Sequence, residues 1–220
     1  MRKLKGIIFD MDGVITDTVP CHYRAWYRMF TEEGFYFDEH IYREKVDGKP
    51  RLEGISSVAI NGSEEKLKEM ASKKQRYFLA SVEKNPPLPF QDAINLIKIL
   101  KKENLKTAVA SSSKNAALIL NKIDIYNLFD EVITGCDFKR GKPDPEIFLT
   151  AADRLKVEPE NCIVIEDAIE GVRAGLNAGI FTFGLARKEN EMDLSHADMV
   201  IKSLDELSIQ KIEKLLKEKL

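Results

Sequence analysis

The sequence predicts an α/β protein in which a parallel sheet is interrupted, after its first strand, by an all-helical insertion. An apolar run at residues 6–9 is typical of a buried strand. Residues 17–85 carry helical patterns and no convincing strand, whereas short apolar strands alternate with helices from residue 92 onward. Such alternation favours a parallel sheet with helices on both faces.

The insertion contains four expected helices. The first begins at Thr18 and ends before Gly34, and aromatic side chains recur along it at helical spacing. The others begin near residues 39, 52 and 64, and Asn61-Gly62-Ser63 caps the last of them. A polar turn at 47–51 separates the second helix from the third. The proline-rich residues 85–90 cannot continue a helix and form the expected linker.

Beyond the linker, strands and helices alternate to the end of the sequence. The expected strands cover residues 106–110, 131–134, 162–165, 180–183 and 199–201. The expected helices cover residues 92–103, 115–123, 145–155 and 169–178, and a capping box at 203–206 precedes an amphipathic C-terminal helix. The chain is therefore expected to form an α/β core, residues 1–16 and 87–220, and a helical domain, residues 17–86.

The composition argues against several classes of protein. Of the 220 residues, 44% are hydrophobic and 32% are charged, but the net charge is only −2, so no strong field indicates a nucleic-acid partner. Without an apolar segment of membrane-spanning length or a signal-peptide core, we expect a cytoplasmic protein with no membrane partner. The widely spaced Cys21, Cys136 and Cys162 favour buried thiols over a disulfide framework or a zinc site.

Two carboxylates one residue apart end the first strand. Alternate side chains of an extended chain share a face, so Asp10 and Asp12 start on the same side, and Gly13 lets the backbone turn directly afterwards. Two anions this close repel each other unless a cation or a proton lies between them. Taken alone, the pair is explained equally well by a strand followed by a polar Asp-Gly turn.

Polar residues also follow three later strands. Hydroxyls and backbone amides at the start of the helix near residue 115 offer an anion site, although a serine cap alone would explain them. Taken singly, Lys142 is explained by an ordinary solvated charge, and the pair Glu166-Asp167 by an ordinary helix cap. The candidate residues at these strand ends are Ser111, Ser112, Lys114, Asn115, Lys142, Glu166 and Asp167.

Taken together, these strand ends predict phosphoryl chemistry. Ligands of open α/β sheets collect at the carboxyl ends of the strands, where four carboxylates, one lysine and a hydroxyl-and-amide cradle are expected to meet. Oxygen ligands of this kind suit Mg²⁺. A carboxylate can attack a phosphoryl group, and Mg²⁺, Lys142 and the Ser111 region would balance the charge of that group.

The motifs resemble those of the haloacid dehalogenase superfamily of phosphotransferases, and within it most closely the β-phosphoglucomutase-like branch. The resemblance covers essentially the whole chain and implies a Rossmann-like core with a helical cap domain formed by the insertion. The matching motifs, in the order of the family, are Asp10-Met11-Asp12-Gly13-Val14-Ile15-Thr16-Asp17-Thr18, Ser111, Lys142-Pro143, and Glu166-Asp167 followed by Gly171.

The resemblance implies a role for each core motif. Asp10 would be the nucleophile and a Mg²⁺ ligand, and Asp12 the general acid and base that also offers its backbone carbonyl to the metal. Ser111 and Lys142 would hold the transferring phosphate. The remaining metal ligands would be Glu166 and Asp167.

In the helical domain the resemblance is incomplete. Arg51 matches an arginine that clamps the non-reacting phosphate in the mutase branch, and His22 matches a histidine at the cap hinge. Where the mutase pattern has a lysine before Gly48, this chain has Asp47, which would repel a phosphorylated sugar; Lys49 is the candidate replacement. Taken alone, Arg51 is explained by a surface charge and His22 by helix packing against Tyr23 or Trp26.

We therefore expect a Mg²⁺-dependent enzyme that forms an aspartyl phosphate and hydrolyses small phosphorylated sugars, acting as a monomer. The first alternative is a β-phosphoglucomutase that interconverts β-glucose 1-phosphate and glucose 6-phosphate. A catalytically silent sugar-phosphate sensor would be expected to lose Asp10 or Asp12, and both are present. A response-regulator receiver fits poorly, because it has no place for the helical insertion. The sequence leaves the physiological substrate open.

Overall fold

The computed structural model describes residues 3–218 apart from residues 48, 61 and 188–193. The predicted turn residues Gly48 and Asn61 therefore lie outside the described residues. The chain forms two compact units, one made of Met1–Asp17 with Leu88–Leu220 and the other of Thr18–Pro87. We call them the α/β unit and the helical unit. The expected domain borders lay one residue earlier, after residues 16 and 86.

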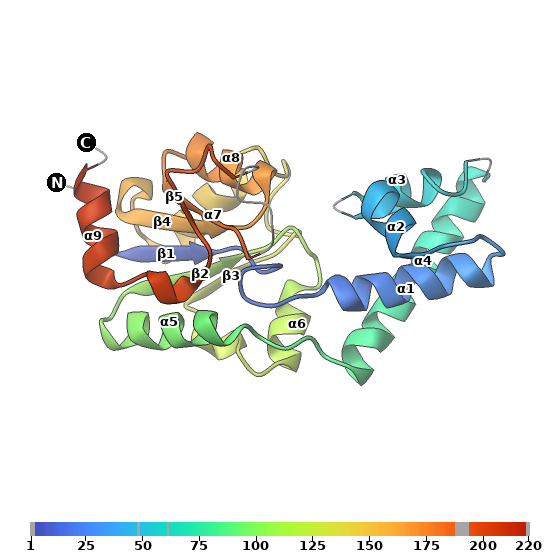
Figure 1. Cartoon of the computed structure of the whole chain (residues 1–220), viewed down its shortest axis with the longest axis horizontal. Helices are drawn as coiled ribbons and strands as arrows, with labels where there is room; N and C mark the ends of the chain where they lie inside the picture. Colours follow the sequence, from blue (N-terminus) through green and yellow to red (C-terminus); the bar gives the residue numbers. More distant parts are fainter. Residues whose placement is uncertain (1–2, 48, 61, 188–193, 219–220) are drawn as a thin grey trace. The chain divides into compact units, whose positions relative to one another are not determined.

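A six-stranded parallel sheet forms the centre of the α/β unit (Figure 1). The strands lie in the order β3-β2-β1-β4-β5-β6, with the first strand of the sequence inside the sheet. All residues of β1, β4 and β5 are buried, because both faces of the central sheet are covered. The strands are β1 (Gly6–Phe9), β2 (Lys106–Ala110), β3 (Glu131–Ile133), β4 (Cys162–Glu166), β5 (Phe181–Leu185) and β6 (Met199–Ile201).

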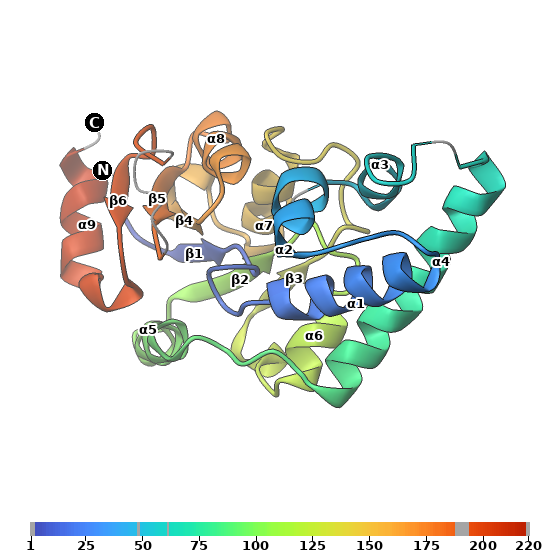
Figure 2. The ribbon, with the colours of Figure 1, turned by 45° about the vertical axis from the view of Figure 1, so that its right-hand side comes forward.

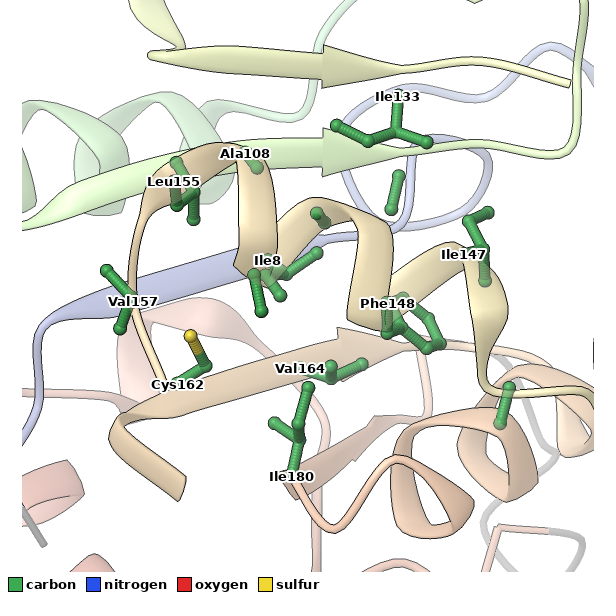
Figure 3. Close-up of a cluster of buried hydrophobic side chains, with 14 residues drawn as sticks. Ile8, Ala108, Ile133, Ile147, Phe148, Leu155, Val157, Cys162, Val164 and Ile180 are labelled. Carbon is green, nitrogen blue, oxygen red and sulfur yellow. The ribbon is translucent and has the colours of Figure 1, made fainter. Parts of the chain in front are cut away.

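Helices connect these strands. The helices are α5 (Gln91–Lys102), α6 (Ala116–Lys122), α7 (Glu146–Leu155), α8 (Ile169–Asn177) and α9 (Ile209–Glu218), with short 3-10 turns η2 (Tyr126–Leu128), η3 (Pro159–Asn161) and η4 (Leu204–Glu206). Figure 3 shows α7 laid across the sheet, with Phe148 and Leu155 packed against Ile8, Ala108 and Val164. This apolar layer fixes the strands whose ends carry the candidate site.

The helical unit is built around aromatic side chains. Its elements are α1 (Val19–Glu32), α2 (Glu39–Ile41) with the π-helical turn η1 (Tyr42–Val46) that continues it, α3 (Arg51–Ser56) and α4 (Glu64–Lys84). Helix α1 packs along α4 (Figure 2). The ring of Phe30 stacks on Trp26 and on Phe37, with centroids 5.6 and 4.7 Å apart. The described part of this unit contains no strand, as the helical patterns predicted.

The α/β fold with a helical insertion is confirmed, with three local corrections. The strand predicted at 180–183 covers Phe181–Leu185, because the amide of Ile180 bonds to Gly175 at the end of α8 and is not available to the sheet. The capping box at Ser203 is present but opens the 3-10 turn η4, and α9 begins only at Ile209.

The third correction concerns a cysteine. All three thiols are free, and Cys21 and Cys162 are buried as expected, but Cys136 is exposed because it lies in the loop after β3. No helix in the described ranges is long and apolar enough to cross a membrane.

Candidate active site

The parallel register brings the predicted strand-end residues to one edge of the sheet. Phe9 of β1 lies beside Val109 of β2 and beside Ile165 of β4. Since parallel strands end at the same edge, Asp10, Ser111 and Glu166 follow these three neighbours on the same side of the unit. The order of the strands, with β1 between β2 and β4, therefore places Asp10 centrally.

Asp10 is almost completely buried, with 6% of its surface exposed. Its backbone amide continues the sheet by donating to the carbonyl of Ile165, at 3.0 Å. The ammonium of Lys142 donates to Asp10 Oδ1 at 2.5 Å. This hydrogen bond orients the carboxylate and offsets part of its charge.

Lys142 joins the ends of two strands that are adjacent in the sheet. Its Nζ also donates to Glu166 Oε1, so one ammonium bridges Asp10 and Glu166. Burial opposes the charged lysine, but the charges of both carboxylates and their hydrogen bonds outweigh burial and raise the pKa of Lys142 above its ordinary value. The lysine is therefore a permanent cation at this site.

Glu166 is held by protein donors at both carboxylate oxygens. Lys142 binds Oε1, and the backbone amide of Ala168 donates to Oε2 at 2.8 Å. A Cβ added to Gly171 would lie 1.9 Å from Oε1, so the first turn of α8 reaches this carboxylate only with glycine there. Gly171, which belonged to the predicted motif, thus makes room for Glu166.

Asp167 lies against the turn that follows β1. A Cβ on Gly13 would be 1.8 Å from Asp167 Oδ2, and Gly13 has φ +77, so glycine is needed both for space and for backbone conformation. Burial, followed by the charge of Glu166, raises the pKa of Asp167 to about 7, and the charge of Asp12 acts in the same direction. Asp167 and Asp12 are therefore electrostatic neighbours.

The carboxylates crowd one another. Burial raises the pKa of Asp10 well above its usual range, and the charges of Glu166, Asp167 and Asp12 add to the increase, while Lys142 opposes it. One lysine does not neutralise four acids. A second cation, or a proton bound to one of the carboxylates, would relieve this repulsion.

Ser111 is buried at the end of β2, where its amide donates to the carbonyl of Ile133, at 3.0 Å. Its hydroxyl accepts from the amide of Ser113 at 3.1 Å, and the hydroxyl of Ser113 accepts from the amide of Asn115 at 3.2 Å. Ser112 and Lys114 are exposed in the same turn. Helix α6 that follows has seven residues and no side-chain cap, so an ordinary serine cap, the alternative explanation of these residues, is not formed.

In the helical unit, the structure places His22 beside a lysine that the sequence analysis missed. Lys74 Nζ lies 2.9 Å from His22 Nδ1, and the imidazole stacks on Phe78 with ring centroids 4.2 Å apart. Burial, together with the charges of Lys74 and Arg51, lowers the pKa of His22 to about 3. His22 is therefore neutral at physiological pH and shares a hydrogen bond with Lys74.

Lys74 is 4% exposed, and its ammonium lies 4.7 Å from the ring centroid of Trp26 and 5.0 Å from that of Phe78. Burial, together with the charge of Arg51, lowers the pKa of Lys74 to about 7. A signal was present in the sequence, because Lys74 stands four residues from Met70 and from Phe78 on the buried stripe of α4. A lysine within such a stripe indicates either a satisfied buried charge or a functional group.

The other candidates in the helical unit are more exposed. Arg51 Nη2 donates to Gln75 Oε1 at 2.5 Å, which directs the guanidinium towards α4. Asp47 accepts from the hydroxyl of Tyr42 at 2.9 Å. Lys49 is exposed in the turn and forms no side-chain hydrogen bond or ion pair among the described residues. Arg51 and His22 therefore belong to one basic group with Lys74, and Lys49 does not join its hydrogen bonds.

The chain matches known proteins over nearly its full length. A family model described as haloacid dehalogenase-like hydrolase matches residues 4–179. A β-phosphoglucomutase of Bacillus subtilis is 35% identical over 94% of this chain and 93% of its own length. A phosphorylated carbohydrates phosphatase of Thermotoga maritima is 34% identical over 80% of this chain and 82% of its own length.

A solved structure gives the same result. The crystal structure of a β-phosphoglucomutase from Clostridium difficile superposes with a TM-score of 0.83 at 34% identity, covering 98% of each chain. The family model spans β1 to the end of α8, and so includes every strand end that carries a candidate residue. The buried aspartate, the bridging lysine and the acidic pair thus belong to an enzyme of the haloacid dehalogenase-like hydrolase family, β-phosphoglucomutase-like branch.

Proposed function

We propose that this enzyme transfers phosphoryl groups through an aspartyl phosphate on Asp10 and mainly hydrolyses small phosphorylated sugars. The observation that carries the proposal is the bridge from Lys142 to both Asp10 and Glu166 at the centre of the sheet edge. A carboxylate held this way presents one oxygen to Lys142 and keeps the other for attack. We also propose that the enzyme acts in the cytoplasm and that it is a monomer. Light scattering of the purified chain would test the oligomeric state.

In the first half-reaction, an oxygen of Asp10 attacks the phosphorus of the substrate. The bond from phosphorus to the sugar oxygen breaks as the bond to Asp10 forms, and Asp12 gives its proton to the leaving oxygen. The products are the free sugar and an aspartyl phosphate. The charge of Asp12 is one of those that raise the pKa values of Asp10 and Asp167, which places its carboxyl group near both.

In the second half-reaction, water attacks the phosphorus of the aspartyl phosphate. Asp12 takes the proton of the water, the bond from phosphorus to Asp10 breaks, and inorganic phosphate leaves with Asp10 restored. A mutase would use a sugar hydroxyl in place of water. The hydrolase and the mutase therefore share every group described in the α/β unit.

The charge of the transferring phosphate needs partners other than Asp10. Lys142 is a permanent cation within reach of Asp10, and Ser111 contributes a hydroxyl at the neighbouring strand end. Hydrogen-bond donors fixed before the reaction stabilise the developing charge without a reorganisation cost. We assign phosphate binding to these two positions.

Enzymes of this family generally use Mg²⁺. Crowded carboxylates with raised pKa values form an oxygen-rich, electron-rich edge that fits a hard divalent cation. Among the described residues, no three His, Cys, Asp or Glu side chains alone make a metal site. We propose that Asp10, Asp167 and the backbone carbonyl of Asp12 hold Mg²⁺. The oxygens of Glu166 already accept from Lys142 and Ala168, so we propose that Glu166 helps to hold Lys142 beside the metal site. Bound Mg²⁺ would neutralise phosphate charge.

The proposed substrate class comes from the relatives and from the helical unit. One relative is named for phosphorylated carbohydrates and another is a hexitol phosphatase of Escherichia coli, 28% identical over 95% of this chain. We propose that the helical unit is the cap domain, in which Arg51, Lys74 and His22 recognise the substrate. Ser112, Lys114 and Asn115 remain the proposed substrate contacts of the α/β unit.

A β-phosphoglucomutase is the second candidate, favoured by the 35% identity to the Bacillus subtilis enzyme and by the basic group around Arg51. Asp47 favours hydrolysis instead, because its carboxylate stands where that branch has a lysine. The hydrogen bond from Tyr42 holds this negative charge in the turn.

The test is ³¹P NMR of the enzyme with β-glucose 1-phosphate, Mg²⁺ and a trace of the 1,6-bisphosphate. Inorganic phosphate as the main product supports hydrolysis, whereas rapid formation of glucose 6-phosphate with little phosphate establishes the mutase. The Asp10→Asn variant provides the background rate. If the wild-type enzyme releases phosphate from none of a panel of sugar phosphates, the proposed substrate class is wrong.

A further inference from the structure

An arginine that no motif includes reaches the active-site edge from the end of another strand. Arg187 lies two residues beyond β5, where the amide of Ala186 still bonds to Ile201 of β6 at 2.8 Å. Only 18% of the Arg187 side chain is exposed. A guanidinium stays charged in proteins, so its burial here requires specific acceptors.

Two of those acceptors are the carbonyls that directly follow Asp12. Arg187 Nε donates to the carbonyl of Gly13 at 3.0 Å, and Nη2 donates to the carbonyl of Val14 at 3.1 Å. One planar group therefore holds two consecutive peptide units of the turn. No rotation of those peptides is possible without breaking at least one charge-assisted hydrogen bond.

The other side of the guanidinium is anchored to Asp92, in the first turn of α5. Nη1 donates to Oδ2 and Nη2 to Oδ1, both at 2.8 Å, and the ring of Phe90 lies 4.1 Å from the guanidinium carbon. Asp92 also accepts from the hydroxyl of Ser203 at 3.1 Å and from the amide of Leu204 at 3.0 Å. Arg187 is thus fixed by a carboxylate that is itself fixed by several donors.

The turn held by Arg187 is the one that carries Asp12. The amide of Gly13 donates to the carbonyl of Thr16 at 2.8 Å, and the amide of Thr16 donates to the carbonyl of Met11 at 3.1 Å. These bonds set the shape of the turn, and Arg187 sets its position relative to α5 and to the strand ends. A side chain on this turn moves with Gly13 and Val14.

We infer that Arg187 is a positioning residue, which tethers the Gly13–Val14 backbone so that Asp12 stays aligned with Asp10 for proton transfer. The inference rests on the proposed function for its kinetic consequence, but the tether itself is independent of the reaction. A displacement of about 1 Å at a reacting group can cost about 100-fold in rate. Arg187 touches no reacting atom and acts only through the turn.

The kinetic test uses Arg187→Ala and Arg187→Lys. We expect Arg187→Ala to lower kcat by about 10- to 100-fold while KM changes by less than about threefold, because the binding groups stay in place. Arg187→Lys keeps the charge opposite Asp92 but lacks the planar guanidinium. This variant should fold, and its kcat should lie between that of wild type and that of Arg187→Ala. A kcat of Arg187→Ala or of a folded Arg187→Lys within twofold of wild type would overturn the inference.

A chemical-rescue experiment separates positioning from general stability. Guanidinium ion at tens of millimolar should restore a measurable share of kcat to Arg187→Ala, because it can occupy the vacated place between Asp92 and the two carbonyls. The same concentration should not accelerate the wild-type enzyme. Failure to rescue a folded Arg187→Ala would contradict the tether as the cause of the lost turnover.

Amide hydrogen exchange tests the tether without any substrate. Exchange over residues 11–16 should be faster in Arg187→Ala and Arg187→Lys than in wild type, whereas exchange of β4 should be unchanged. Arg154→Ala is the matched control, since Arg154 pairs with Asp137 at 2.5 Å elsewhere in the same unit. Unchanged exchange over 11–16 overturns the inference even if wild-type turnover confirms the proposed function, and faster exchange supports the tether even if no sugar phosphate is hydrolysed.

Discussion

Each unit of the chain buries a lysine, and the two lysines have different charged groups beside them. Lys142 of the α/β unit is 12% exposed and lies between the carboxylates of Asp10 and Glu166, which raise its pKa. Lys74 of the helical unit is surrounded by aromatic rings, the neutral His22 and the cationic Arg51, and its pKa is lowered to about 7. The first lysine has its counterions built in, whereas the second has no acidic partner among the residues that the structure describes.

The difference indicates what each unit does with its charge. A lysine compensated by two acids is charged at every physiological pH and orients its partners. A lysine without a counterion is only half charged near pH 7, and a bound anion would favour its charged form. We therefore interpret the helical unit as prepared for an anionic ligand, whereas the lysine of the α/β unit is already paired with Asp10 and Glu166.

The largest expected effect comes from neutralising the carboxylate beside Lys142. Asp10→Asn should lower turnover by about a thousandfold or more, because an amide cannot form the aspartyl phosphate. Steady-state phosphate release measures it, and circular dichroism checks that the variant is folded. Residual activity above a few per cent of wild type in a folded preparation would refute Asp10 as nucleophile.

The second prediction removes the compensated lysine itself. Lys142→Met leaves Asp10 and Glu166 buried without their cation, and should lower the free energy of unfolding by about 3 kcal/mol and strongly reduce turnover. Lys106→Met is the matched control, because Lys106 pairs with Asp130 at 2.9 Å but is 53% exposed, and its loss should cost less than about 1 kcal/mol. Urea unfolding of both variants makes the comparison; equal losses would mean that burial is not what gives the Lys142 bridge its importance.

How much of this could be predicted from the sequence differs between the two lysines. Lys142 was found because parallel strands end at one edge, so polar residues after separate strands predict a shared site without any contact being known. Asp10, Ser111 and Glu166 were placed by the same argument. Their hydrogen bonds, and the fact that Lys142 rather than another group occupies the space between two acids, required the folded chain.

Lys74 and Arg187 were missed for a physical reason. Lys74 stands at helical spacing from Met70 and Phe78, but only the packing of α4 against α1 shows that this stripe is buried and that Lys73 lies with surface acids. Arg187 finds its acceptors 95 and 174 residues away, at Asp92 and Gly13. Partners at that separation leave no local pattern.

The third prediction concerns the uncompensated lysine and has a definite sign with pH. Lys74 has a pKa of about 7 in the folded chain, against 10.5 ordinarily, so between these values the unfolded chain holds a proton that the folded chain does not. Stability therefore falls as pH is lowered from 10.5, and the penalty is complete below pH 7. Lys74→Met removes this loss of stability. The substitution should therefore change the free energy of unfolding more favourably at pH 7.0 than at pH 9.5, by on the order of 2 kcal/mol.

Urea unfolding followed by the fluorescence of Trp26, the single tryptophan, measures this gain within the helical unit. Both pH values lie above the pKa of His22, which is about 3 in the folded chain and 6.5 ordinarily. Lys73→Met is the control: Lys73 bonds to Glu32 and Glu33, which raise its pKa, so its loss should destabilise the unit equally at both pH values. A Lys74→Met effect independent of pH would show that Lys74 is charged when buried.

The smallest expected effect concerns the turn beside this basic group. If the carboxylate of Asp47 disfavours a second phosphate, Asp47→Lys should raise the ratio of isomerised to hydrolysed product severalfold, measured by ³¹P NMR with β-glucose 1-phosphate. Because the substitution also removes the hydrogen bond from Tyr42, Tyr42→Phe is the matched control, since it loses the bond and keeps the charge. A ratio that rises equally in both variants would assign the effect to the shape of the turn, and a ratio unchanged in Asp47→Lys would exclude Asp47 as the group that separates hydrolysis from isomerisation.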